Sequence, residues 1–126
     1  MQKAAVLLVE HRHAEVALAC AAIALHRPEA EVLEAADIRA AMSLLRKEPA
    51  ALRLAILGER AMARAEKLIA ALDRKGLEVP VVGLAAGVSE PAKRQALDCG
   101  VRSVYERPRE WPRYAELMER LLDEWL

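Results

Sequence analysis

Charged and imidazole side chains gather directly after the first apolar segment of the sequence. The segment AAVLLV (4–9) is followed by Glu10, His11 and His13, and another carboxylate, Glu59, follows a later apolar segment. Imidazole and carboxylate groups are the ligands that zinc and other divalent transition metals prefer. These four side chains therefore define a candidate metal site. The alternative is a polar loop, which we favour because no second metal-binding motif accompanies them.

The two cysteines, Cys20 and Cys99, offer less chemistry. They lie far apart in sequence, so they do not form a disulfide framework, and the cytoplasm is the expected compartment. Neither cysteine has a base beside it in the sequence that would activate the thiol. Because no nucleophile, base and orienting group can be named together, we expect neither an enzyme nor a bound cofactor.

The composition is that of one folded domain, spanning residues 1–126, which is either a whole protein or a piece of a longer regulator. Hydrophobic residues make up 55% of the chain, and 19 basic residues balance 19 acidic ones. A net charge of zero argues against direct nucleic-acid or membrane binding by charge alone. The longest apolar run (16–25) is too short to span a bilayer, and the first residues do not resemble a signal peptide.

Short apolar segments alternate with longer helical ones along the whole chain. Apolar patterning, prolines, glycines and capping residues set the boundaries, as where Asp37 caps a helix that stops before Pro49. Strands are predicted over 4–9, 31–35, 52–57, 79–84 and 101–105. Helices are predicted over 14–26, 38–47, 61–75, 89–99 and 111–125.

This alternation predicts an α/β fold with a parallel sheet that is covered by helices on both faces. In such doubly wound sheets, ligands bind at the carboxyl ends of the strands. We therefore expect any site to draw on the segments that follow four of the strands. These segments are 10–13, 58–60, 85–87 and 106–108.

The order of elements and several local motifs resemble bacterial response-regulator receiver domains. The motifs are AVLLVEHRH at 5–13, EVLEAADIRAAMSLLRKEP at 31–49, VPVVGLAA at 79–86 and ALDCGVRSVYERP at 96–108. The resemblance covers the whole chain. It implies a single (βα)5, flavodoxin-like domain whose parallel five-stranded sheet has the order 2-1-3-4-5.

The residues that carry receiver chemistry in that family are replaced in this sequence. Receivers use an acidic pair to hold Mg²⁺, and that pair falls here on Glu10 and His11. Their phosphoacceptor aspartate falls on Gly58, or on Glu59 with a shift of one residue. Their hydroxyl residue falls on Ala85 and their lysine on Arg107. A glycine cannot accept a phosphoryl group, and one carboxylate is a poor Mg²⁺ site.

The resemblance therefore implies a pseudo-receiver that has lost aspartate phosphorylation. Leu57 and Gly58 also resemble the Leu-Gly that follows the third strand in the N-terminal domains of flagellar enhancer-binding transcription activators. At the strand ends, Glu10 and Arg107 are expected to face each other. They either form a permanent ion pair in place of the metal and phosphate contacts, or remain two solvated charges.

The first predicted helix is unusually apolar. Every residue from 16 to 25 (VALACAAIAL) is apolar, whereas a helix that covers one face of a sheet normally has a polar outer stripe. Exposed apolar patches usually mark contact surfaces. We expect a dimer or partner interface here, with Leu18, Ala22 and Leu25 as candidates. The alternative is a surface of alanines that exposes little area.

The last two helices and the strand between them form a second candidate interface, because receivers commonly dimerise through these elements. Tyr105 lies beside Val104, which takes the place of the family's switch aromatic residue, so switching by phosphorylation is not expected. The charged residues of this surface can pair across a dimer or simply stay solvated. The candidates are Lys93, Asp98, Arg102, Tyr105, Arg113 and Glu116.

We interpret the chain as a regulatory domain that works through protein contacts, as a homodimer or with a partner regulatory protein. The alternative is a ligand or metal sensor at the strand ends, using Glu10, His11, His13, Glu59 and Arg107. Fold analogy supports this class of function but not its target.

Overall fold

The computed structural model describes residues 3–47 and 51–126. The strands are β1 (Ala5–Val9), β2 (Glu31–Ala35), β3 (Leu52–Leu57), β4 (Val81–Ala85) and β5 (Ser103–Glu106). The helices are α1 (His13–His26), α2 (Ile38–Lys47), α3 (Glu59–Met62), α4 (Ala65–Arg74), α5 (Glu90–Asp98) and α6 (Trp111–Trp125). Pro49, which we expected to terminate α2, lies outside the described residues.

The five strands form one parallel sheet in the order β2-β1-β3-β4-β5. This confirms the predicted doubly wound (βα)5 topology. Because β1 has β2 on one side and β3 on the other, the chain changes direction across the sheet between β1 and β3. All five strands point the same way, so the segments that follow them meet at one edge of the sheet, as parallel pairing requires.

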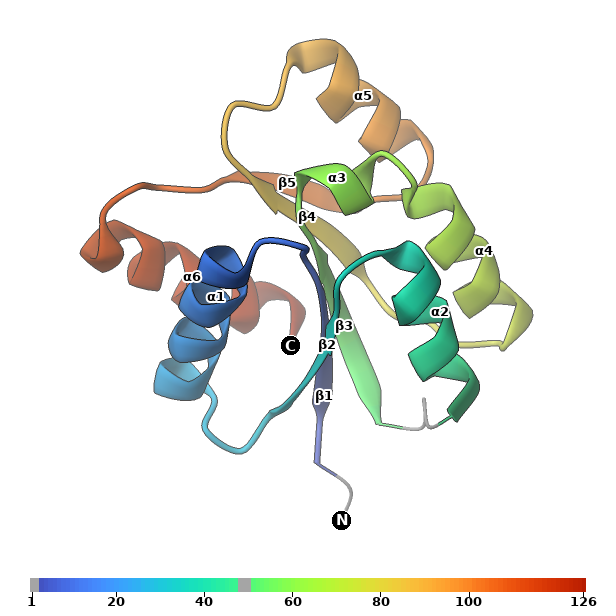
Figure 1. Cartoon of the computed structure of the whole chain (residues 1–126), viewed down its shortest axis with the longest axis horizontal. Helices are drawn as coiled ribbons and strands as arrows, with labels where there is room; N and C mark the ends of the chain where they lie inside the picture. The colour runs from blue at the N-terminus through green and yellow to red at the C-terminus, as the bar shows by residue number, and fades with distance from the viewer. Residues whose placement is uncertain (1–2, 48–50) are drawn as a thin grey trace.

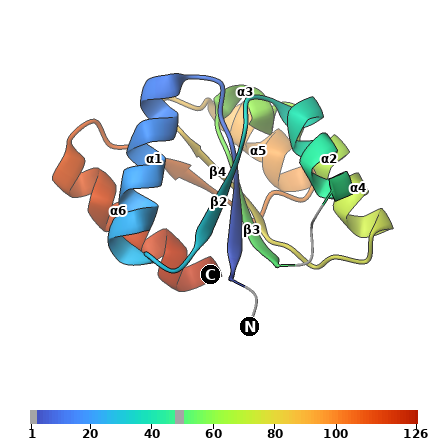
Figure 2. The same ribbon diagram turned by 60° about the horizontal axis from the view of Figure 1, so that its bottom comes forward.

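Helices cover both faces of the sheet. Figures 1 and 2 show α1 and α6 packed side by side on one face, and α2, α3, α4 and α5 on the other. Successive residues of a strand point to opposite faces. Accordingly Leu7 and Val9 of β1 belong to the core under α2–α5, whereas Val6 and Leu8 belong to the core under α1 and α6. Burial on both faces explains why β1 and β4 are apolar throughout and why β3 has a single charged residue, Arg53.

The predicted helix 61–75 is wrong in one respect, because two helices, α3 and α4, take its place. The chain turns at Ala63 and Arg64, where the Arg64 N–H donates to the Ala61 carbonyl, 2.9 Å away. The reason is a tertiary contact. The Met62 side chain occupies the space where a Cβ atom on Gly83 of β4 would stand. The turn lets Met62 fill this space while Leu68 still reaches the same core.

Two strands begin two residues later than predicted. β4 begins at Val81 rather than at residue 79, because Pro80 has no N–H to donate to a neighbouring strand. β5 begins at Ser103 rather than at 101, after Gly100 has turned the chain in the left-handed region with φ of 116°. β5 therefore includes Glu106, one of the residues that we placed after the strand.

Two general findings concern the described residues only. Within 3–47 and 51–126 no helix is long and apolar enough to cross a membrane. Both cysteines are free thiols. Burial and the nearby Glu34 carboxylate raise the pKa of Cys20, whose sulfur lies 3.7 Å from a Glu34 oxygen, so this thiol stays protonated near neutral pH.

Candidate functional site at the carboxyl ends of the strands

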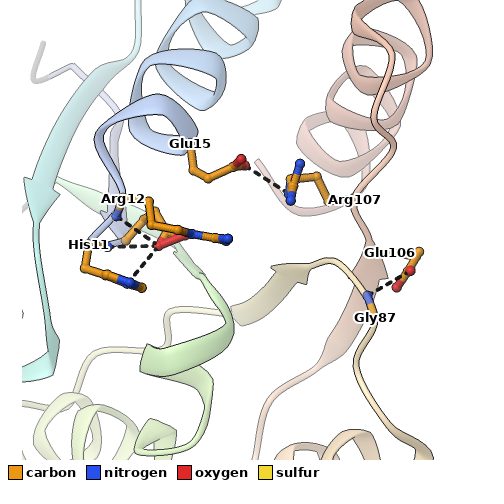
Figure 3. Close-up of polar contacts among 7 residues, drawn as sticks. His11, Arg12, Glu15, Gly87, Glu106 and Arg107 are labelled. Carbon is orange, nitrogen blue, oxygen red and sulfur yellow. Dashed lines mark hydrogen bonds and ion pairs between the residues drawn. The ribbon is translucent and has the colours of Figure 1, made fainter.

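Glu10 is the one buried charged residue in the described part of the chain, with 8% of its surface exposed. Its carboxylate is held by its own neighbours in sequence. The backbone N–H of His11 donates to Oε2 at 2.9 Å, and the Arg12 guanidinium donates to Oε1 from Nη2 at 3.1 Å and from Nε at 3.3 Å (Figure 3). The hydrogen bond from Arg12 to Glu10 raises the pKa of the guanidinium. Glu10 is thus fixed in place at the end of β1.

The Glu10 carboxylate lies directly against Gly58, the residue on which the resemblance to receivers places the phosphoacceptor. A Cβ atom at residue 58 would lie 2.8 Å from Oε1 and 2.9 Å from Oε2 of Glu10. Both distances are shorter than real carbon–oxygen contacts, so a larger side chain at this position requires the carboxylate to move. The backbone of Gly58 is extended, with φ of −73° and ψ of 178°, and its N–H donates to the Val9 carbonyl. Residue 58 is therefore restricted to glycine by the Glu10 carboxylate, which takes the space of a side chain, and not by the backbone conformation.

Of the two alternatives for Glu10 and Arg107, the structure contains neither their mutual ion pair nor two solvated charges. Arg107 instead pairs with Glu15, in the first turn of α1, with Nε 2.9 Å from Oε2 (Figure 3). This contact is an ion pair without hydrogen-bond alignment. Both side chains are 16% exposed, so solvent screens the pair only partly. Each predicted partner has a closer opposite charge, since Arg12 neutralises Glu10 and Glu15 neutralises Arg107.

These contacts close the space between Glu10, Gly58 and Arg107, where the resemblance to receivers places the phosphorylation site. The cavity between Glu10, Gly58 and Arg107 measures only about 10 Å³. A single water molecule needs at least that much volume. Below the cavity lies the buried ring of Tyr114, and burial, together with the nearby Glu15, raises the pKa of its phenol. The described side chains leave no room at this point for a phosphoryl group with a hydrated metal ion.

The other residues expected at the strand ends do not join this cluster. Ala85 is fully buried at the end of β4 and contributes no polar group. Glu106 turns toward the β4–α5 loop, where its Oε1 accepts the Gly87 N–H at 3.0 Å (Figure 3). Gly87 has φ of 67°, a left-handed conformation that favours glycine. Glu106 therefore orders this loop.

The metal-site alternative receives no support from the geometry. Among residues 3–47 and 51–126, no three or more His, Cys, Asp or Glu side chains lie together in a way that could hold a metal ion. His11 lies beside Glu10, with Nδ1 3.4 Å from Oε2. His13 and Glu59 are exposed and belong to the starts of two different helices, α1 and α3. The four side chains that we named as ligands are therefore not assembled.

One of the three interface candidates on α1 is wrong. Ala22 is completely buried, because it faces the core between α1, α6 and the sheet. Leu18 is half-buried against the same core, whereas Leu25 is 60% exposed. The outer face of the helix instead carries alanines, and its exposed apolar residues are Ala14, Ala17, Ala21, Ala24 and Leu25.

On the second candidate surface, the partly exposed Tyr105 is held by residues of its own chain. The Tyr105 hydroxyl donates to Glu124 at 2.6 Å and accepts from the Trp125 indole at 2.7 Å, both on α6. Burial raises the pKa of this phenol. The charged candidates remain without ion pairs inside the described part of the chain, since the pairs found there involve other residues. They are Lys93, Asp98, Arg102, Arg113 and Glu116.

Two residues of the site were missed at the sequence level, namely Arg12 and Glu15. Arg12 stands two residues after Glu10, and Glu15 lies three residues further along. The sequence contained one signal for Arg12, because this basic residue follows so closely after the carboxylate at the end of an apolar strand. Glu10 is bound by Arg12 from its own loop, and Arg107 is bound by Glu15 from the first turn of α1.

Comparisons with known proteins show the fold. No protein-family model matches the sequence, and a search of curated proteins found no match. A response regulator from Hahella chejuensis has a TM-score of 0.83 at 19% identity, over 98% of this chain and 95% of that chain. The phosphorylated cyanobacterial phytochrome response regulator RcpA has a TM-score of 0.78 at 22% identity, over 98% and 94%.

A third similar structure, NtrX from Brucella abortus, is much longer. It has a TM-score of 0.73 at 19% identity, and the match covers 98% of this chain but 27% of that one. This chain therefore has the flavodoxin-like fold of response-regulator receiver domains. At these identities the similarity extends to the fold, and function has to be argued from the site.

Proposed function

We propose that this chain is a phosphorylation-independent, receiver-like regulatory domain that works through protein contacts and has no enzymatic activity. The closed strand-end site carries the proposal. Where receivers have a phosphoacceptor, this chain has Gly58 covered by the Glu10 carboxylate, and the remaining cavity is about 10 Å³. The fold is kept while the space for its usual chemistry is filled by the chain's own side chains.

The same contacts support a fixed conformation of the domain. Glu10 is held by two neighbouring residues, and Arg107 is held by Glu15 of α1. Tyr105 is bonded to two residues of α6. A ligand shifts an equilibrium between two conformations only if it binds one of them more tightly than the other. With no space for a phosphoryl group, regulation in this domain depends on which partner it binds.

The outer face of α1 is the contact surface that we propose for a homodimer. Ala14, Ala17 and Ala21 are exposed on successive turns, and Leu25 has 60% of its surface exposed at the end of the same face. Alanine lets two helices approach closely, and an exposed leucine is the kind of large apolar group that association buries. The charged surface on α5, β5 and α6 is the second candidate, through ion pairs that set the register of a dimer.

We further propose that the domain belongs to a bacterial signalling or transcription regulator in the cytoplasm. The match to about a quarter of NtrX supports this setting, because the same fold occurs there within a longer chain. The Leu57-Gly58 pair supports a relation to the flagellar enhancer-binding activators. Such a domain would regulate a neighbouring domain or a partner regulatory protein.

Sedimentation velocity at increasing concentration tests this function, with and without acetyl phosphate and Mg²⁺. We expect reversible dimerisation that the phosphodonor does not change. Leu25→Glu should make the chain monomeric, because it places a charge in the apolar contact. Leu97→Glu changes an exposed leucine on α5, at the second candidate surface, and should leave the dimer unchanged if α1 forms the contact. A chain that stays monomeric, or that dimerises only with the phosphodonor, would contradict the proposal.

A further inference from the structure

A groove with a strongly positive lining lies between α2 and the α3–α4 segment. Its volume is about 670 Å³. The two walls are neighbours in space although they lie far apart in sequence, and both figures that show the whole chain place α2 beside α4 (Figures 1 and 2). The lining residues are His11, Ala36, Asp37, Ile38, Arg39, Met42, Arg60, Ala61, Arg64 and Lys67.

The positive charges of this groove are not neutralised within the described part of the chain. Ion pairs between described residues involve other groups, so Arg39, Arg60, Arg64 and Lys67 have no carboxylate within 4 Å. The single carboxylate in the lining is already engaged, because Asp37 accepts the Ala40 N–H at 2.8 Å and caps α2. In a chain with no net charge, four such cations in one groove form a local excess.

The position and the shape of the groove are those of a ligand site. It opens beside His11, at the edge of the sheet where β1 separates β2 from β3, and ligands of doubly wound sheets bind at this change of direction. Its volume lies in the range of about 300–1,000 Å³ that small-molecule sites occupy. Met42, Ile38 and Ala61 supply an apolar wall among the cations.

We propose that this groove binds a small phosphorylated molecule with an apolar ring system, of the nucleotide type. Guanidinium groups form bidentate hydrogen bonds with phosphate oxygens, and three arginines line the groove. The apolar wall at Met42 provides a surface for a ring that carries the phosphates. This site is distinct from the closed cavity at Gly58, and its occupation does not depend on whether the chain dimerises.

A small ligand fits the groove better than an extended polyanion. Beyond Met42, the α2–α4 surface continues into a smaller hollow of about 320 Å³, lined by Arg46, Arg74 and Lys75 among others. A nucleic acid or an acidic peptide would lie along both hollows. The larger hollow has more cations, four against three, and it alone lies at the change of direction in the sheet, so we place the ligand there.

Isothermal titration calorimetry with ATP and with pyrophosphate, at low salt and without added metal, tests this proposal. We expect saturable 1:1 binding of ATP, and weaker binding of pyrophosphate because it has no ring to contact Met42. Arg60→Glu/Arg64→Glu should weaken ATP binding by at least about tenfold, since two charge-assisted contacts are lost. The control Arg94→Glu/Arg120→Glu changes the net charge equally on exposed residues outside the groove and should leave binding unchanged.

Four results would overturn the proposal in whole or in part. Absence of saturable binding would remove the site, and an equal loss of affinity in both double variants would show that only net charge matters. Tighter binding of a single-stranded oligonucleotide than of ATP, weakened by Arg46→Glu/Arg74→Glu, would assign the groove to an extended polyanion. Equal affinities for ATP and pyrophosphate would overturn the contact between the ring and Met42. All four substituted arginines in the groove and control variants are exposed, so we expect folding to be kept, and circular dichroism checks it.

Discussion

The substitution Gly58→Ala tests directly whether the Glu10 carboxylate fills the phosphoacceptor position. The new Cβ atom would meet the Glu10 oxygens at 2.8 and 2.9 Å. The carboxylate cannot retreat freely, because the His11 N–H and the Arg12 guanidinium hold it. Overpacking of this kind costs roughly 1–3 kcal/mol. The backbone at residue 58 suits alanine, and the smaller entropy of the unfolded chain returns about 0.4–1 kcal/mol.

The net expectation is a loss of about 1–2 kcal/mol in the free energy of unfolding. In a Glu10→Ala background, the same Gly58→Ala change meets no carboxylate. Only the entropic gain remains, so it should then stabilise the chain by about 0.4–1 kcal/mol. The coupling energy between the two sites is therefore about 2 kcal/mol, and the effect of Gly58→Ala changes sign. Glu10→Ala alone should cost about 2–4 kcal/mol, since it removes the hydrogen bonds from His11 and Arg12.

Urea unfolding of the four proteins in this cycle, followed by circular dichroism, measures these values. The dependence of the unfolding free energy on urea should be the same in all four, which shows that the unfolded states are comparable. The reasoning is refuted if Gly58→Ala has the same effect with and without the Glu10 carboxylate. In that case the carboxylate does not occupy the space beside residue 58.

Two further predictions concern the ion pair between Glu15 and Arg107 and the two tyrosines. In urea unfolding, Arg107→Met should destabilise the chain by roughly 1–3 kcal/mol, because it leaves the Glu15 carboxylate unpaired. Adding Glu15→Gln to this variant should recover part of the lost stability. No recovery would show that the two side chains are not energetically coupled. Burial raises the pKa of both tyrosines, Tyr105 and Tyr114, so the folded chain holds these protons more tightly than the unfolded chain does. The contribution of the two protonated tyrosines to the free energy of unfolding is complete below the ordinary tyrosine pKa of 10.0 and is lost as the pH rises further. In a pH titration, the absorbance of tyrosinate at 295 nm should therefore rise at higher pH in the folded chain than in urea. Coincident titration curves would contradict the burial of these phenols.

Much of the fold follows from local sequence patterns. The predicted boundaries of β2, β3, α2 and α6 match the structure, because apolar periodicity and capping residues act within a few positions of each boundary. The break between α3 and α4 could not be predicted in this way. No proline or glycine marks it, and it depends on Met62 packing against Gly83, which lies far along the chain on β4.

The site shows the same division between local and long-range information. The sequence places Glu10, Gly58, Ala85 and Arg107 at strand ends, and the structure has all four at that edge of the sheet. The sequence does not reveal which oppositely charged side chain each one contacts. An ion pair between Glu10 and Arg107 was one of two alternatives, yet Glu10 contacts Arg12 and Arg107 contacts Glu15. The positive groove was also missed, since its walls come from segments about twenty residues apart that only the fold brings together.

Amide NMR spectra recorded during titration with Mg²⁺ and then beryllofluoride, a phosphoryl mimic, test the central claim most directly. The cavity beside Gly58 is about 10 Å³ and its carboxylate is already engaged, so we predict no saturable shifts at Glu10, Gly58, Ala85 and Arg107. Saturable shifts of these amides would show that the strand-end site opens to the ligands of its fold relatives, and they would contradict a phosphorylation-independent domain.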